Sequence, residues 1–157
     1  MSVQNFGVDS SPGVLSYADG IAMRAHDGLL LIGRVLIGWI FVMSGWRKLM
    51  DIPAFVATMP RRGLPDFLGY VAPPVEFLGG LCLVFGFATR YAVLVMLVFM
   101  AFATFSSHRY WTFTDPAQYG NQSSHFWKNV SMTGGLVLLF VTGAGRYAID
   151  RLLMRKA

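Results

Sequence analysis

Four long apolar runs constrain this chain more than any other feature. They cover about residues 28–46, 67–89, 91–107 and 127–145. Each is close to ~20 residues, the length with which a helix crosses a hydrocarbon core of ~30 Å. Only helices satisfy their own backbone polar groups in lipid, and the alternating ~10-residue segments of a transmembrane barrel are absent. The sequence therefore predicts an all-α integral membrane protein, a bundle of four transmembrane helices.

Composition agrees with a chain that has the lipid bilayer as its main partner. Hydrophobic residues make up 55% of the sequence and charged residues 13%, whereas a soluble domain has roughly 25% charged residues. The net charge is +5, but the basic residues lie mostly at the ends of apolar runs, so no nucleic-acid partner is indicated. The single cysteine, Cys82, excludes an intramolecular disulfide and dithiol chemistry within the chain.

Segments outside the four runs set the domain organisation. Residues 1–27 are polar, with Gly, Ser, Pro and Asp throughout, and are predicted to be a flexible tail before one membrane domain over 28–157. Residues 52–59 are apolar but too short to span, which indicates an interfacial or re-entrant segment. Pro73 and Pro74 either kink the second helix or make it start near residue 73.

Loop charges nearly balance on the two sides of the predicted bundle. A tight turn at Thr89–Arg90 makes the second and third helices an antiparallel hairpin, and 109–126 is expected to be a polar, aromatic loop. The side that holds both termini carries Arg24, Arg90, Arg146, Arg151, Arg155 and Lys156; the other carries Arg47, Lys48, Arg61, Arg62, Arg109 and Lys128. The positive-inside rule alone therefore does not orient the chain.

Ionisable groups within the runs are the candidate functional residues. Burying a charge in lipid is costly, so a charged residue within a span usually has an interaction partner or a function. Those singled out are Arg34 and Glu76 inside the first two runs, with Lys48, Asn129, His108 and His125 near run ends. Helical spacing places Arg34 and Glu76 each on a stripe along its own helix. The two stripes are Arg34-Gly38-Phe41-Gly45-Lys48 and Glu76-Gly80-Leu83-Phe87-Arg90. Facing stripes would form a polar seam inside the bundle.

Chain direction sorts these groups by depth. All except Arg34 lie towards the side of the first and third loops, while Arg34 is offset from Glu76 by about 9 Å at 1.5 Å per residue. Two hypotheses follow. In the first, Glu76 forms a structural ion pair with Arg34 or Lys48. In the second, the polar groups line a pocket for a quinone headgroup or a small anion, where Glu76 carries a proton and Lys48 or a histidine bonds a quinone carbonyl.

Other kinds of site have less support. A metal or haem pair of His108 and His125 is disfavoured because their spacing matches no metal motif, so no metal site is predicted. No phosphate-binding loop, nucleophile elbow or HExxH motif is present, and no cofactor other than a quinone is indicated. The catalytic residues, if the chain is an enzyme, are not identified.

Several motifs together resemble the DoxX family of small bacterial inner-membrane proteins. They are LLLIGRVLIGWIFVMSGWRKL at 29–49, GLP at 63–65, VEFLGGLCLVFGFATR at 75–90, KNVSMTGGLVLL at 128–139 and GAGRYAID at 143–150. The residues on characteristic positions of the family are Arg34, Gly45, Lys48, Glu76, Gly80, Arg90, Asn129 and Gly145. The loop RYWTFTDPAQYGNQSSHFW is longer here than in the simplest members.

The resemblance implies a four-helix bundle in the bacterial inner membrane, and with the charges after the fourth run it favours cytoplasmic termini. Some members are membrane subunits of oxidoreductase assemblies, including a thiosulfate:quinone oxidoreductase, and others belong to oxidative-stress complexes. We therefore expect a quinone-handling membrane subunit with a redox-protein partner. The alternatives are a membrane anchor without chemistry and, ranked last because no inverted repeat is evident, a small transporter.

Overall fold

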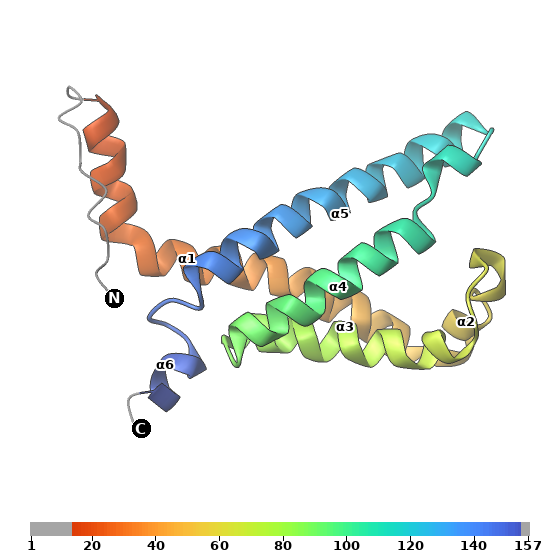
Figure 1. Cartoon of the computed structure of the whole chain (residues 1–157), viewed down its shortest axis with the longest axis horizontal. Coiled ribbons are helices and arrows are strands. Elements are labelled where there is room, and N and C mark those ends of the chain that lie inside the picture. The colour runs from red at the N-terminus through yellow and green to blue at the C-terminus, as the bar shows by residue number, and fades with distance from the viewer. Residues whose placement is uncertain (1–13, 155–157) are drawn as a thin grey trace.

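The chain is all-helical in the computed structural model, which describes residues 14–154. No strand occurs within that range. The helices, shown in Figure 1, are α1 (Val14–Met50), α2 (Ile52–Val56), η1 (Pro60–Arg62), α3 (Phe67–Phe85), α4 (Thr89–Ser107), η2 (Tyr110–Thr112), α5 (Pro116–Thr142) and α6 (Ile149–Met154). The predicted all-α fold class is confirmed.

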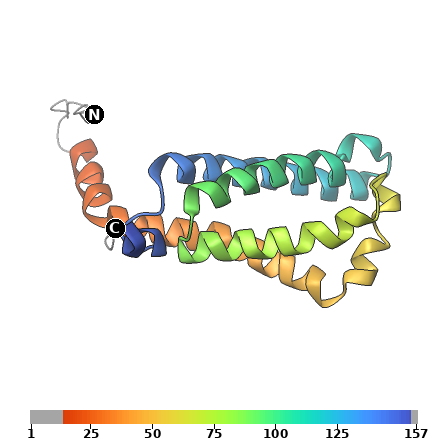
Figure 2. The ribbon, with the colours of Figure 1, turned by 60° about the horizontal axis from the view of Figure 1, so that its bottom comes forward.

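The four long helices form two antiparallel pairs, α1 with α3 and α4 with α5 (Figure 2). The short α2 and η2 lie at one end of these pairs, which we call the loop end. The α3–α4 turn and α6 lie at the opposite end, which we call the terminal end (Figure 1). The first turns of α1 run at an angle to the rest of this helix and away from the bundle (Figures 1 and 2).

Three helical segments are long and apolar enough to cross a membrane: Tyr17–Met50, Phe67–Phe85 and Thr89–Thr112. Each carries many apolar side chains on the outside of the fold, as expected where the surroundings are lipid. α5 has 27 residues, enough for about 40 Å, but Lys128 and Asn129 interrupt its apolar run. Three of the four predicted spans thus satisfy length and hydropathy together.

The α1–α3 pair is held close by small residues. Gly38, Gly45 and Gly80 are buried between the two helices. A Cβ on Gly80 would lie 2.7 Å from Val42 N, and a Cβ on Gly45 would lie 2.6 Å from Phe77 N. Backbone meets backbone at these points, which is the packing that small residues permit in membranes. The two predicted stripes do face each other along this part of the pair.

Replacing Gly45 with alanine is expected to destabilise the fold by about 1–3 kcal/mol, because the added methyl group overpacks against a backbone that cannot rotate away. Thermal unfolding of the purified protein in a mild detergent measures the loss. Gly134→Ala is the matched control, since nothing lies within 4 Å of a Cβ at this α5 position. The control is expected to be neutral or stabilising by up to about 1 kcal/mol. Equal stability of the two variants would contradict the close approach.

Two predicted boundaries are wrong. α1 begins at Val14 and not near residue 28, so the described part of the predicted flexible tail is helical, while residues 1–13 lie outside the described range. α5 begins at Pro116, inside the predicted loop 109–126. Asp115 caps this helix by accepting from Gln118 N–H at 2.9 Å, and proline at the first position suits a helix start.

The remaining boundaries are close to their predictions. α3 begins at Phe67 and contains both Pro73 and Pro74, so the later start near residue 73 is excluded. Residues 52–59 form the short helix α2 and the turn after it. The turn between α3 and α4 is tight, with Gly86 and Ala88 in left-handed conformations.

Candidate functional site

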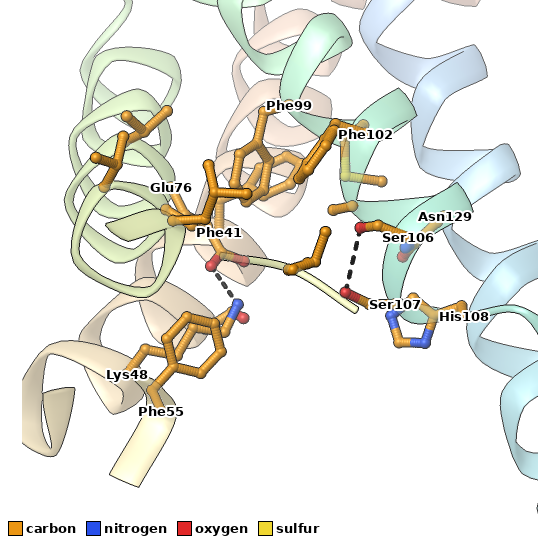
Figure 3. A pocket seen from close by; sticks show the side chains of 18 of the residues that line it. Phe41, Lys48, Phe55, Glu76, Phe99, Phe102, Ser106, Ser107, His108 and Asn129 are labelled. Atoms are coloured by element: carbon orange, nitrogen blue, oxygen red, sulfur yellow. Dashed lines mark hydrogen bonds and ion pairs between the residues drawn. The ribbon is translucent and has the colours of Figure 1, made fainter. Parts of the chain in front are cut away.

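A cavity of about 510 Å³ lies between the two helix pairs at the loop end. Its walls come from α1, α3, α4 and α5, and the segment from Phe55 to Leu64 closes it on the loop side. Apolar side chains make most of the wall, among them Phe41, Phe99 and Phe102 (Figure 3). Polar side chains gather at one end. The cavity therefore has an apolar body and a polar end, which is the shape of an amphiphile site.

One polar wall of the cavity is an ion pair between α1 and α3. Lys48 Nζ donates to Glu76 Oε2, and Figure 3 shows the two side chains pointing toward each other. Glu76 is only 5% exposed. Lys48 Nζ also lies 5.3 Å from the centre of the Phe55 ring, a cation–π distance. Of the two ion pairs that the sequence allowed, the structure has Lys48–Glu76, and the pairing of Arg34 with Glu76 is not formed.

The facing wall carries polar groups from α4 and α5, most of them neutral. Asn129, Ser106, Ser107 and His108 point into this side (Figure 3). Asn129 is 7% exposed, and no group among the described residues forms a hydrogen bond with its side chain. Buried amides usually have partners, so this one is an available donor and acceptor inside the cavity.

The two histidines have different surroundings. His108 lines the cavity, and its Nδ1 lies 2.9 Å from Gln122 Oε1. His125 stacks on the His108 ring with centroids 5.2 Å apart and does not line the cavity. Within residues 14–154 no three His, Cys, Asp or Glu side chains are grouped to hold a metal ion.

Two hydrogen bonds that were not predicted from the sequence hold the loop end closed. Arg62 Nη1 donates to Ser107 Oγ at 3.0 Å, and Arg109 Nη2 donates to the Arg62 carbonyl at 3.0 Å. These bonds tie the segment after α2 to the end of α4. Burial lowers the pKa of the Arg62 guanidinium, although arginine remains protonated under physiological conditions. The only sequence signal was a pair of arginines in a segment punctuated by proline and glycine.

The cavity also borders the outer surface of the bundle between α3 and α4. Val71 on α3 and Val95, Val98 and Phe102 on α4 line it while remaining exposed, Val98 to 73%. Exposed apolar side chains on a membrane-spanning helix face lipid. The cavity therefore borders the lipid-facing surface between these two helices.

Arg34 lies outside this cavity, at the terminal end. It is 2% exposed and donates from Nη1 to the Ala144 carbonyl at 2.8 Å and from Nη2 to the Tyr147 carbonyl at 2.7 Å. Close by, Asp150 accepts from the N–H groups of Ala88 and Thr89, at 2.6 and 2.8 Å, and so caps α4. Arg34 and Asp150 join α1 and α4 to the segment after α5. Asp150 was not singled out from the sequence.

Comparison with known families agrees with the sequence motifs. Residues 29–109, just over half of the chain, match the DoxX family. The chain belongs to the DoxX family. Residues 74–155 also match the SURF4 family, and the two matches overlap at 74–109. The DoxX match contains Lys48, Glu76 and His108, while Asn129 falls only in the second match.

Two curated relatives of this DoxX protein are inner membrane proteins of one bacterium. Inner membrane protein YqjF of Escherichia coli (strain K12) is 35% identical over 133 residues, which are 85% of this chain and 98% of YqjF. Inner membrane protein YphA of the same strain is 33% identical over 129 residues, 81% of this chain and 91% of YphA.

A third relative, CatD of Bacillus subtilis (strain 168), is named as a candidate oxidoreductase; it is 38% identical over 63 residues, 40% of this chain and 46% of CatD. No solved structure matches the chain significantly. Together with the three apolar helices, the family match makes this an integral membrane protein.

Proposed function

We propose that this DoxX protein lies in the bacterial inner membrane as the membrane subunit of a redox assembly, and that its loop-end cavity takes the headgroup of a membrane quinone. In this proposal α5 is the fourth span and both termini are cytoplasmic. The names of YqjF and YphA support the location, and the name of CatD supports redox chemistry. The observation that carries the proposal is the cavity itself, apolar along its body, polar at one end and bordered by lipid-facing side chains.

The polar groups fit the needs of a quinone. Its two carbonyl oxygens accept hydrogen bonds, and donors are available on both walls, at Lys48 Nζ and at the Asn129 amide. Its isoprenoid tail is apolar and would leave the cavity between α3 and α4, past Val71 and Val98. A small soluble anion would use the cation but would have no use for the apolar body. The cavity volume of about 510 Å³ suits a headgroup and the first part of a tail.

Reduction of a quinone to a quinol takes up two electrons and two protons. In the proposed assembly the electrons come from a redox-protein partner at the loop end. Lys48 and Asn129 stabilise the negative charge that grows on the quinone oxygens as electrons arrive. Glu76, the carboxylate of the ion pair with Lys48, takes up a proton from the loop-end side and passes it to the headgroup, twice in succession.

Binding of a short-chain ubiquinone to the purified full chain tests the proposal. We expect saturable binding, and Asn129→Leu is expected to weaken it about two- to tenfold, the loss of a hydrogen bond worth roughly 0.5–1.5 kcal/mol. Asn121→Leu is the matched control, because Asn121 is exposed on α5 and does not line the cavity. Mass spectrometry of lipid extracts should also find quinone retained by the protein. Absence of both retained quinone and saturable binding would contradict the proposal.

One observation favours a second candidate function, a membrane anchor for a partner protein without chemistry of its own. Glu76 and Lys48 satisfy each other, as a purely structural ion pair would. If this function is the right one, a partner protein co-purifies, and Glu76→Gln leaves electron transfer in the assembly unchanged. A marked loss of electron transfer in a Glu76→Gln protein that still assembles would exclude it.

A further inference from the structure

A second cavity, of about 920 Å³, lies at the terminal end of the bundle and has no part in the proposed quinone site. It is formed by the first turn of α4, the segment that follows α5, and α6. Three arginines line it, one from each of these segments: Arg90, Arg146 and Arg151. Buried Arg34 adds a fourth positive charge behind the wall, since it is bonded to the carbonyls of lining residues Ala144 and Tyr147.

The two carboxylates at this cavity are engaged in holding the fold. Both oxygens of Asp150 accept from backbone N–H groups at the start of α4, and Asp27 Oδ1 accepts from Arg146 N–H at 3.0 Å. Arg90 donates to the carbonyls of Phe140 and Val141, at 3.1 and 3.4 Å, and these bonds leave its charge in place. Arg146 and Arg151 are exposed, and no described side chain forms an ion pair with either. Positive charge therefore exceeds negative charge at the cavity.

Apolar and aromatic side chains flank the arginines on the outer surface. Tyr91 is 77% exposed on α4, and Tyr147, Leu152 and Leu153 are exposed on and before α6. These residues lie where membrane-spanning helices end, the level at which tyrosine and arginine meet lipid headgroups. A short helix with exposed leucines beside arginines is suited to the boundary between headgroups and acyl chains.

We propose that the terminal-end cavity binds the phosphate group of an anionic phospholipid. The guanidinium groups of Arg146 and Arg151 donate to the phosphate oxygens, with Arg90 beside them, and arginine suits phosphate because its planar fork donates two hydrogen bonds at once. Leu152 and Leu153 lie against the acyl chains. A lipid accounts for both the arginines and the apolar flank, whereas free phosphate accounts only for the arginines.

Lipid titration of the purified full chain in a neutral detergent tests this inference. Native mass spectrometry would count bound dioleoyl phosphatidylglycerol and, separately, dioleoyl phosphatidylcholine, which has the same acyl chains. We expect phosphatidylglycerol to bind preferentially. Arg146→Gln/Arg151→Gln is expected to weaken its binding about twenty-fivefold, at about fivefold for each basic residue. Arg146→Lys/Arg151→Lys should keep most of the preference because both charges remain.

Controls separate a site from general charge attraction. Arg24→Gln/Arg61→Gln removes the same charge at exposed positions outside the cavity and should leave the preference unchanged. Glu76→Gln and Asn129→Leu should also leave the preference for phosphatidylglycerol unchanged. The test of lipid binding is therefore independent of the quinone proposal. If the double variant does not fold, Arg151→Gln is tested alone, and its binding of phosphatidylglycerol is expected to be about fivefold weaker.

Three results would overturn the inference. The first is equal binding of the two lipids by the wild-type protein. The second is an equal loss of preference in Arg24→Gln/Arg61→Gln and Arg146→Gln/Arg151→Gln. The third is a thermal stabilisation by inorganic phosphate alone that matches the stabilisation by phosphatidylglycerol, because it would assign the cavity to free phosphate.

Discussion

Lys48→Met is expected to lower the free energy of unfolding by about 3 kcal/mol, because it leaves the Glu76 carboxylate buried in the membrane domain without its cation. The side chain of Glu76 is only 6% exposed, while that of Lys48 is 28% exposed. Partial exposure of the lysine places the expected loss at the lower end of the range for breaking a buried ion pair, about 3–5 kcal/mol. Denaturant titration of the purified protein in mixed micelles would measure the change.

The double variant Lys48→Met/Glu76→Gln turns this result into a test of function. Removing both charges leaves no buried unpaired ion, so stability should return to within about 1 kcal/mol of the wild-type protein. Short-chain ubiquinone binding can then be measured on a folded protein that lacks the ion pair. Weakened binding supports the quinone proposal, and unchanged binding supports a purely structural pair.

Lys128→Met is the control for the stability measurement. Lys128 also borders the cavity, but it is exposed and forms no ion pair with a described residue. Its replacement should change stability by no more than about 0.5 kcal/mol. An equal loss for Lys48→Met and Lys128→Met would show that the ion pair is not what stabilises the α1–α3 contact.

The membrane-spanning helices were predictable because lipid imposes a length and an apolar composition on them. The helical extensions were not, although their signals were present. The chain from Val14 to Asp27 is polar but holds no proline, and it continues a helix that is already nucleated, so extension costs little. The start of α5 has a capping signal, Asp115 followed by Pro116. This signal lies inside a segment whose polarity predicts a loop.

Residue spacing could place the polar groups at the correct ends of the bundle but could not choose their partners. The Arg34–Glu76 ion pair is not formed, because Arg34 donates instead to two backbone carbonyls near its own depth in the bundle. These carbonyls lie in the connection between α5 and α6. The position of a backbone carbonyl in the fold cannot be inferred from the residue types in the sequence. The roles of Arg62 and Asp150 depend on tertiary contacts between segments at least 45 residues apart in the chain, which no local pattern encodes.

Arg34→Met is expected to destabilise the protein by about 3–5 kcal/mol. The substitution removes two hydrogen bonds from a charged group, worth roughly 1.5–3 kcal/mol each, and leaves the carbonyls of Ala144 and Tyr147 without this donor. Hydrogen exchange should accelerate most in 144–150, because Arg34 is what fixes this connection to α1. Thermal unfolding in detergent measures the global loss.

Two further variants show whether geometry or charge matters at this position. Arg34→Lys keeps the charge but offers a point donor in place of a planar fork, so it should recover less than half of the loss. Arg90→Met removes an exposed arginine whose bonds go to the end of α5, and it should cost no more than about 1 kcal/mol. A stable Arg34→Met protein would contradict the anchoring role. Quinone binding supplies the independent check: because Arg34 lies outside the loop-end cavity, the folded Arg34→Lys protein should bind ubiquinone like the wild type.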